Sequence, residues 1–434
     1  MNKSVSPKLN DADLLAGLKD FGTAAMAGIC KDQDDLHDAL SSGGFRLLQG
    51  YTFKIGTAIQ SAQSAVIGRA IKLLGPQLGA EKDVDDILWQ VFVDSLANDS
   101  MNEGAFIQSF KEELTSYTQL VRRVIAPNYL FRVSEGIGPV VIGPVAIRSG
   151  ADVVDEVQAW NENPRWRIAV SPKSLGMNVV DGVAEIGVSD TIFDVSVQAS
   201  QQNADEEAFW LIDVATSLVR LTIPRWNSFA PAIGKPEALS VSPSDGRTNT
   251  IKIVDKNLKA GGWSLPGFYL VEASQYSAIR DPKFQNLANS ILNPKSGSVA
   301  ERLSQAFGWL TRGRQSTERA QRFLFFFTAI EALLSSDDKN SPVIQTIARH
   351  AGVVWSNDVT IRAQLADLIK KLYSARSALV HAGSRKVSRS DADTIQQIAE
   401  TLAFRIAAEM DVETPYKDLV QELGAASHGS PWRP

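Results

Sequence analysis

The chain has 434 residues, of which 44% are hydrophobic and 21% are charged, and its formal net charge is −5. This length exceeds one ordinary hydrophobic core and predicts two or three domains. The net negative charge argues against a generally basic protein that coats nucleic acid, although it is compatible with a local basic patch.

Cys30 is the single cysteine, so neither an intrachain disulfide nor a thiolate metal cluster can form. The N-terminus lacks the apolar core of a signal peptide. The strongest apolar run, Phe323–Leu334, is shorter than the roughly 20 residues that a membrane span needs. No glycine-rich nucleotide motif or metal-ligand spacing is present. We therefore expect a soluble, cytoplasmic protein with no cofactor and no membrane contact.

Residues 1–127 are expected to form a helical N-terminal region. Asp11 precedes an apolar pattern that includes Leu14 and Leu18, as at a capped helix start. Breaks between helices are predicted at Gly75-Pro76 and at Ala126-Pro127-Asn128. The further helices expected here are Gly44–Leu74, Val84–Leu96 and Glu103–Ile125.

Residues 128–295 are expected to form a mixed α/β domain with a sensing or regulatory role. Valine- and isoleucine-rich runs, separated by glycine and proline, are typical of short strands. The segment Ala204–Leu221 has helical periodicity instead. The expected strands are Arg165–Val170, Val183–Val188, Thr191–Gln198, Leu221–Trp226 and Thr250–Val254.

Residues 296–414 have the clearest helical periodicity, and their short connections favour an antiparallel helical bundle. Residues 415–434 are expected to be a flexible tail. The predicted fold is thus a multidomain α+β chain that ends in a bundle. Its expected helices are Val299–Arg312, Thr317–Leu334, Pro342–Val354, Thr360–Val380 and Arg389–Met410.

Arg376 and His381 end one of these helical patterns, in a chain with only four histidines. Histidine moves protons near neutral pH, and arginine is well shaped to hold a phosphate. Positions five apart on a helix are about 140° apart around its axis, whereas Ser377 and His381 share a face. Either a helix end near His381 or two copies meeting at this segment can bring the pair together. Cations near a helix C-terminus are also ordinary, because they complement the helix dipole.

The segment Arg376–Gly383 resembles the signature of the HEPN superfamily, an arginine and a histidine separated by four to six residues on a late helix of a bundle. It is most similar to the Apea-like branch, in which an aromatic helix with a glutamate precedes the motif, as Phe323–Leu334 does with Glu331. That branch usually has glycine directly after the histidine, whereas Ala382 intervenes here. The resemblance covers about 296–411.

The resemblance implies a metal-independent endoribonuclease of a bacterial toxin or anti-phage system, acting as a homodimer on tRNA or mRNA. The RNA 2′-hydroxyl would attack the adjacent phosphate, with His381 as general acid or base and Arg376 stabilising the developing charge. Ser377 would bind phosphate or orient His381. A phage-derived trigger or regulatory partner would act on the N-terminal or middle region.

Glu331 lies in a helix that is apolar on nearly every face, so its carboxylate requires a partner. We expect Arg376 or Tyr373 to be that partner. Glu331 either ties two helices together or orients Arg376 for phosphate.

One group of basic residues precedes the helix Phe323–Leu334, and another follows the motif Arg376–Gly383. Each group either contacts the RNA backbone or forms a solvated helix end. The candidate RNA-binding residues are Arg312, Arg314, Arg319, Arg322, Arg385 and Lys386.

Two other functions remain open from the sequence. One is a catalytically inactive HEPN-like module that binds RNA or dimerises. The other is an unrelated helical scaffold in which the motif occurs by chance.

Overall fold

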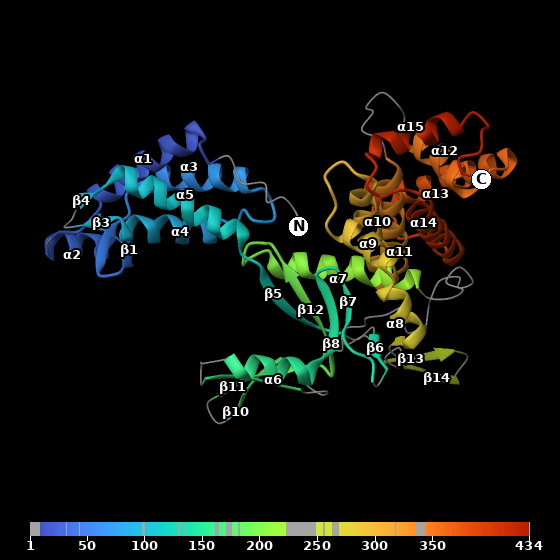
Figure 1. Ribbon diagram of the computed structural model, residues 1–434, viewed down its shortest axis with the longest axis horizontal. Coiled ribbons are helices and arrows are strands. Elements are labelled where there is room, and N and C mark those ends of the chain that lie inside the picture. The colour runs from blue at the N-terminus through green and yellow to red at the C-terminus, as the bar shows by residue number, and fades with distance from the viewer. Residues whose placement is uncertain are drawn as a thin grey trace. The chain divides into compact units, whose positions relative to one another are not determined.

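A computed structural model shows a mixed α/β protein with a mostly helical C-terminal region (Figure 1). It describes residues 9–222 and 249–433, apart from residues 32, 43, 98–99, 129–130, 135, 161–164, 171–175, 181–182, 255–256, 263–268, 317 and 336–342. The chain divides into two compact units, the first of Met1–Val124 with Ser196–Ala208 and the second of Ile125–Val195 with Phe209–Pro434.

The first unit is built from helices and two small hairpins. Phe21, Phe53, Trp89, Phe92 and Phe106 are all at most 1% exposed and pack edge-on or tilted against one another. The elements are α1 (Ala12–Ala27), α2 (Gln33–Ser42), β1 (Phe45–Leu48), β2 (Tyr51–Lys54), α3 (Thr57–Leu74), α4 (Glu81–Asp94), β3 (Leu96–Ala97), β4 (Ser100–Met101) and α5 (Glu103–Gln119).

Two helices predicted in this unit are shorter than expected. The span Gly44–Leu74 begins with the antiparallel pair β1–β2 before α3 starts. Its turn places Gln49 at φ 46° and Gly50 at φ 88°, a left-handed pair that matches the twist of a hairpin. The span Glu103–Ile125 is divided at Gln119, where α5 ends and strand β5 (Arg122–Pro127) follows. Both predictions were therefore wrong over these strands.

The expected boundary near residue 295 is not where the two units separate. Residues 196–208 join the first unit, in which the Ser200 amide donates to the Gln77 carbonyl at 3.0 Å. The rest of the middle region and the C-terminal helices form one unit. The predicted strands at Arg165–Val170, Val183–Val188, Thr191–Gln198 and Thr250–Val254 lie within one residue of observed strands. The predicted strand Leu221–Trp226 lies outside the described residues from position 223 on.

The β elements of the second unit form small sheets. A four-stranded sheet has the order β5–β12–β8–β7, and a three-stranded sheet has the order β10–β11–β9. Strands β6 and β15 form a parallel pair, and β13 and β14 form an antiparallel pair. The bounds are β6 (Phe131–Val133), β7 (Val140–Ile142), β8 (Val145–Ser149), α6 (Gly150–Trp160), β9 (Trp166–Val170), β10 (Gly176–Val180), β11 (Val183–Val188), β12 (Thr191–Val197), α7 (Ala204–Leu221), β13 (Asn249–Val254), β14 (Asn257–Gly262) and β15 (Tyr269–Val271).

The C-terminal helices pack around α11, which contacts α10, α12, α13 and α14. Helices α10 and α11 pack along each other across a short connection, as do α12 and α13, so each pair is antiparallel. The bounds are α8 (Ala273–Arg280), α9 (Pro282–Leu292), α10 (Val299–Gln315), α11 (Arg319–Leu334), α12 (Val343–Trp355), α13 (Val359–Ala382), α14 (Arg389–Glu409) and α15 (Tyr416–Ala426).

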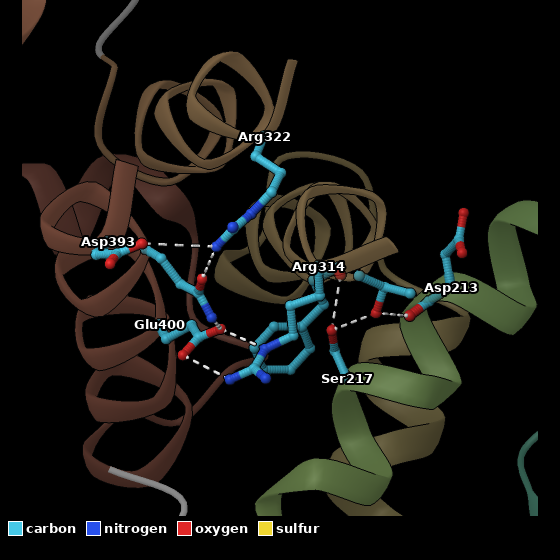
Figure 2. Close-up of polar contacts among 9 residues, drawn as sticks. Asp213, Ser217, Arg314, Arg322, Asp393 and Glu400 are labelled. Atoms are coloured by element: carbon cyan, nitrogen blue, oxygen red, sulfur yellow. Dashed lines mark hydrogen bonds and ion pairs between the residues drawn. The ribbon is translucent and has the colours of Figure 1, made fainter. Parts of the chain in front are cut away.

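Helix α7 is joined to α10 by polar and aromatic contacts. The Ser217 hydroxyl lies 2.7 Å from that of Thr311 and donates to the Phe307 carbonyl at 2.8 Å (Figure 2). Any side chain at Gly308 would meet the ring of Trp210, because a Cβ atom there would lie 2.5 Å from it. These contacts explain why the second half of α7 belongs to the same unit as the bundle.

The predicted flexible tail is instead an ordered part of the bundle, because its backbone is held by buried side chains. Arg362 is 7% exposed and donates to the Ser356, Ala426 and Ser430 carbonyls at 2.7–2.9 Å. Its Nη2 also donates to Asn357 at 3.2 Å. Local sequence patterns do not reveal this clamp, since it joins residues more than sixty positions apart.

No helix in the described part of the chain has the length and apolar character to cross a bilayer.

Replacement of Arg362 by alanine should lower the free energy of unfolding by about 2–4 kcal/mol, because four acceptors lose a buried donor. Urea denaturation of the full chain measures this loss. The exposed Lys417 on α15 provides the control, since Lys417→Ala removes a cation without these bonds. Equal stability of Arg362→Ala and Lys417→Ala would restore the flexible-tail interpretation.

Candidate functional site

Arg376 lies on the buried line of α13. Leu365, Ile369 and Leu372 are at most 6% exposed, and their spacing of four and three residues is that of one helix face. A further step of four residues reaches Arg376. The arginine therefore occupies a position that faces the neighbouring helix.

Glu331 of α11 is the partner of this arginine. Arg376 Nη2 donates to Glu331 Oε2 at 3.1 Å, and both side chains are 22% exposed. The guanidinium also lies 5.8 Å from the ring of Tyr373, which packs on Phe327 at 5.7 Å. The pairing of Glu331 expected from the sequence is thus confirmed, and Tyr373 contacts the arginine rather than the carboxylate.

The Glu331–Arg376 pair sits in a partly desolvated place. Burial raises the pKa of the Glu331 carboxyl, and the charge and hydrogen bond of Arg376 act in the opposite direction. Arg376 donates to Glu331 through Nη2, and its buried Nε has no hydrogen-bond partner among the described residues. The guanidinium is therefore anchored at one side and retains unused donor capacity.

His381 lies in the last turn of α13 and is exposed. The helix ends one residue later, where Gly383 adopts φ 62° and its amide donates to the Ala378 carbonyl. This left-handed C-cap agrees with the predicted end of the helix and explains the glycine. The exposed Val380, with 46% of its surface accessible, lies beside His381.

One copy of the chain does not bring Arg376 and His381 onto one face. Both residues are helical, so the rotation of about 140° between them applies in full. Ser377 and His381 do share a face, and Ser377 is half-buried. Arg376 is directed toward α11, whereas His381 is exposed to solvent.

His350 is the other histidine of the bundle, and it is only 2% exposed. Burial, together with the charge of Arg349, lowers the pKa of His350 to about 4. The imidazole of His350 is therefore enclosed in the bundle, unlike the exposed imidazole of His381. His37 and His428 are exposed, outside the motif.

Arg314, a candidate RNA contact, is instead buried against α14. Its side chain is 1% exposed, and it binds both oxygens of Glu400, at 2.5 and 2.9 Å (Figure 2). A bidentate buried pair of this kind holds two helices together and presents no charge to a ligand.

Arg322 continues the same polar network. It donates to Gln396 at 2.8 Å, lies 4.0 Å from Asp393, and is linked through Gln396 to Glu400. Burial lowers the pKa of Arg322. The prediction that Arg314 and Arg322 bind RNA is therefore wrong, because neither guanidinium lies on the surface.

Arg312 is held by an acidic partner on α7. Its Nε donates to Asp213 at 2.9 Å, and its guanidinium lies over the rings of Trp210 and Trp309. Burial raises the pKa of Asp213 to about 6, against the influence of Arg312. The remaining basic candidates, Arg319, Arg385 and Lys386, are exposed.

Sequence reasoning missed the acidic side of this network. Asp393, Gln396 and Glu400 are three and four residues apart and so form one polar line along α14. A polar line on the apolar face of a helix is the signal that could have identified them as partners for buried cations.

A scan against protein-family models, a search of curated proteins and a search of solved structures each found no match to this chain. The resemblance to the HEPN superfamily therefore rests on the residues of α11 and α13 alone. Within the described ranges, no group of three or more His, Cys, Asp or Glu side chains is placed to hold a metal ion.

Arg314→Ala should destabilise the chain by about 3–5 kcal/mol, because it leaves Glu400 buried without its cation. Arg319→Ala, at an exposed position of the same basic stretch, should change stability by less than about 0.5 kcal/mol. Urea denaturation compares the two. Equal, small effects would contradict the structural role of Arg314.

Proposed function

We propose that this chain is an endoribonuclease that cuts RNA without a metal ion, at the last two turns of α13. The observation that carries the proposal is the combination of an anchored arginine and an exposed histidine on one continuous helix. Glu331 holds the Arg376 guanidinium at 3.1 Å, and His381, five residues later on the same helix, is open to solvent. These are the groups that phosphate binding and proton transfer require.

The chemistry is an internal transfer at phosphorus. The RNA 2′-oxygen forms a bond to the adjacent phosphorus while the bond to the 5′-oxygen breaks. His381 accepts the 2′-hydroxyl proton or supplies one to the leaving oxygen, and Arg376 stabilises the negative charge on the phosphoryl oxygens. Ser377, on the face of His381, hydrogen-bonds the phosphate. The products are a 2′,3′-cyclic phosphate and a 5′-hydroxyl.

Two copies of the chain complete the site in this proposal. The rotation of about 140° along α13 separates Arg376 from His381 within one copy. A symmetric pair that meets at this segment places the arginine of one copy near the histidine of the other. The exposed Val380 supplies apolar surface for such a contact.

A second candidate function is an inactive module that binds RNA or dimerises. The same ion pair favours it, because Arg376 already has a carboxylate partner and its first role is to join α11 and α13. RNA binding by a chain that leaves the RNA intact would identify this second function.

Wild-type protein should cut tRNA or a structured mRNA in EDTA, and His381→Ala and Arg376→Ala should each lower the rate by about 10²–10⁴-fold. Glu331→Gln should lower it less, because the arginine remains but loses its anchor. Mapping of the product ends measures both the rate and the chemistry. DNA of the same sequence should stay intact, since it lacks the 2′-hydroxyl.

His428→Ala is the matched control, because His428 is also exposed but lies outside the motif. Cutting by His381→Ala at the wild-type rate would contradict the proposal. Products that carry a 3′-hydroxyl and a 5′-phosphate would contradict it as well.

A further inference from the structure

The connection between α13 and α14, residues 383–388, folds back onto the start of α11. Arg319 donates to the Val387 carbonyl at 3.4 Å, and Arg385 donates to Glu318 at 2.8 Å. Val387 itself is 6% exposed and packs inward. The connection is therefore held against α11, and its basic side chains have a defined place on the surface.

Four cations surround this junction, and we call Arg319, Arg385, Lys386 and Arg389 the basic patch. All four are exposed, and the side chains of Arg385 and Arg389 are 78% and 70% accessible. Residues 318–321 and 385–393, which leave out the buried Arg322, together contain four cations and three carboxylates, a local charge of +1 in a chain of net charge −5. The surface here is thus opposite in sign to the chain as a whole.

Two carboxylates in the same place already bind these cations. Glu318 pairs with Arg385 at 2.7 Å, and Asp393 lies 3.7 Å from Arg389. Burial raises the pKa of Asp393, while Arg322, Arg389 and Arg319 all act to lower it. The Glu318–Arg385 pair is exposed on both sides, and exposed ion pairs contribute little to stability, so an incoming polyanion can replace Glu318 at small cost.

The patch directly follows the proposed catalytic histidine in the chain. Arg385 is four residues after His381, so their Cα atoms are at most about 14 Å apart. The Ser384 amide bonds to the Ala378 carbonyl at 3.1 Å, which turns the connection sharply at the helix end. A nucleic-acid strand that lies on the patch can therefore reach His381 within a few nucleotides.

We propose that the basic patch binds the backbone phosphates of a single-stranded RNA segment beside the nucleotide that is cut, and that Glu318 and Asp393 compete with the RNA for these cations. The position beside the cut rests on the proposed function, whereas the binding itself does not require cleavage. Because the patch contacts phosphates and no bases, it holds RNA with little regard to sequence.

The test is the binding of a fluorescein-labelled single-stranded RNA to the full chain at several NaCl concentrations. All proteins carry His381→Ala, so the RNA stays intact. The triple variant Arg385→Ala/Lys386→Ala/Arg389→Ala should bind at least about tenfold more weakly. Its slope of log affinity against log salt should be smaller by about 2, because each lost contact on a single strand contributes about 0.7.

The substitution Glu318→Gln should change the RNA affinity in the opposite direction. A folding defect cannot produce such an increase. It should strengthen RNA binding by about two- to fivefold, because Arg385 loses its competing carboxylate. The matched control is Lys370→Ala/Lys371→Ala, which removes two exposed cations from α13 away from the patch and should leave the slope unchanged.

The patch is overturned if the triple variant binds RNA as tightly as its parent, if the lysine control weakens binding equally, or if the parent shows no measurable binding. If the triple variant binds RNA more weakly but the wild-type protein leaves RNA uncut, the basic patch is supported and the proposed nuclease activity is contradicted. If the wild-type protein cuts RNA but the patch substitutions leave RNA binding unchanged, the nuclease activity is supported and the basic patch is contradicted.

Discussion

The bundle depends on how its central helix accommodates charge. Helix α11 is buried along most of its length, with Phe323, Phe326, Phe327 and Ile330 fully enclosed, yet it carries Arg322 near one end and Glu331 near the other. A charge in such a place is costly unless a neighbour supplies its partner. Helix α14 does so for Arg322 through Gln396 and Asp393, and α13 does so for Glu331 through Arg376.

This requirement sets the rotation of α13 about its axis. Once Arg376 faces Glu331, the helical repeat fixes the direction of every later side chain, and His381 must lie about 140° further round. The helix continues past His381 to Ala382 before Gly383 ends it, so nothing local relieves this separation. The proposed need for a second copy follows from this geometry and would follow in any chain with the same pairing.

Much of the bundle could be predicted from the sequence, because its helices have long apolar periodicity and strong caps. The expected helix at Arg389–Met410 differs from α14 by one residue, and Ser388 caps it by accepting from the Asp391 amide. The pairing of Glu331 was also predictable, since a carboxylate in an apolar helix must find a cation. The hairpin at Phe45–Lys54 was missed because its turn uses Gln49 in a left-handed conformation that glutamine rarely adopts.

The roles of the basic residues were less accessible to sequence reasoning. Arg314 and Arg319 are five residues apart in one basic stretch, but the first is enclosed by Glu400 and the second is exposed. The partner lies 86 residues away, and only the packing of α10 on α14 brings it close. The clamp of Arg362 on the C-terminal segment has the same cause, because local patterns do not reveal long-range acceptors.

A mixing experiment tests the central claim, that Arg376 of one copy acts with His381 of another. Arg376→Ala and His381→Ala proteins are mixed, allowed to exchange, and assayed for RNA cleavage against each protein alone. The account predicts that the mixture cuts RNA, because a mixed pair retains one complete arginine–histidine combination. A mixture as inactive as its components, under conditions where wild type cuts and exchange is shown to occur, would contradict it.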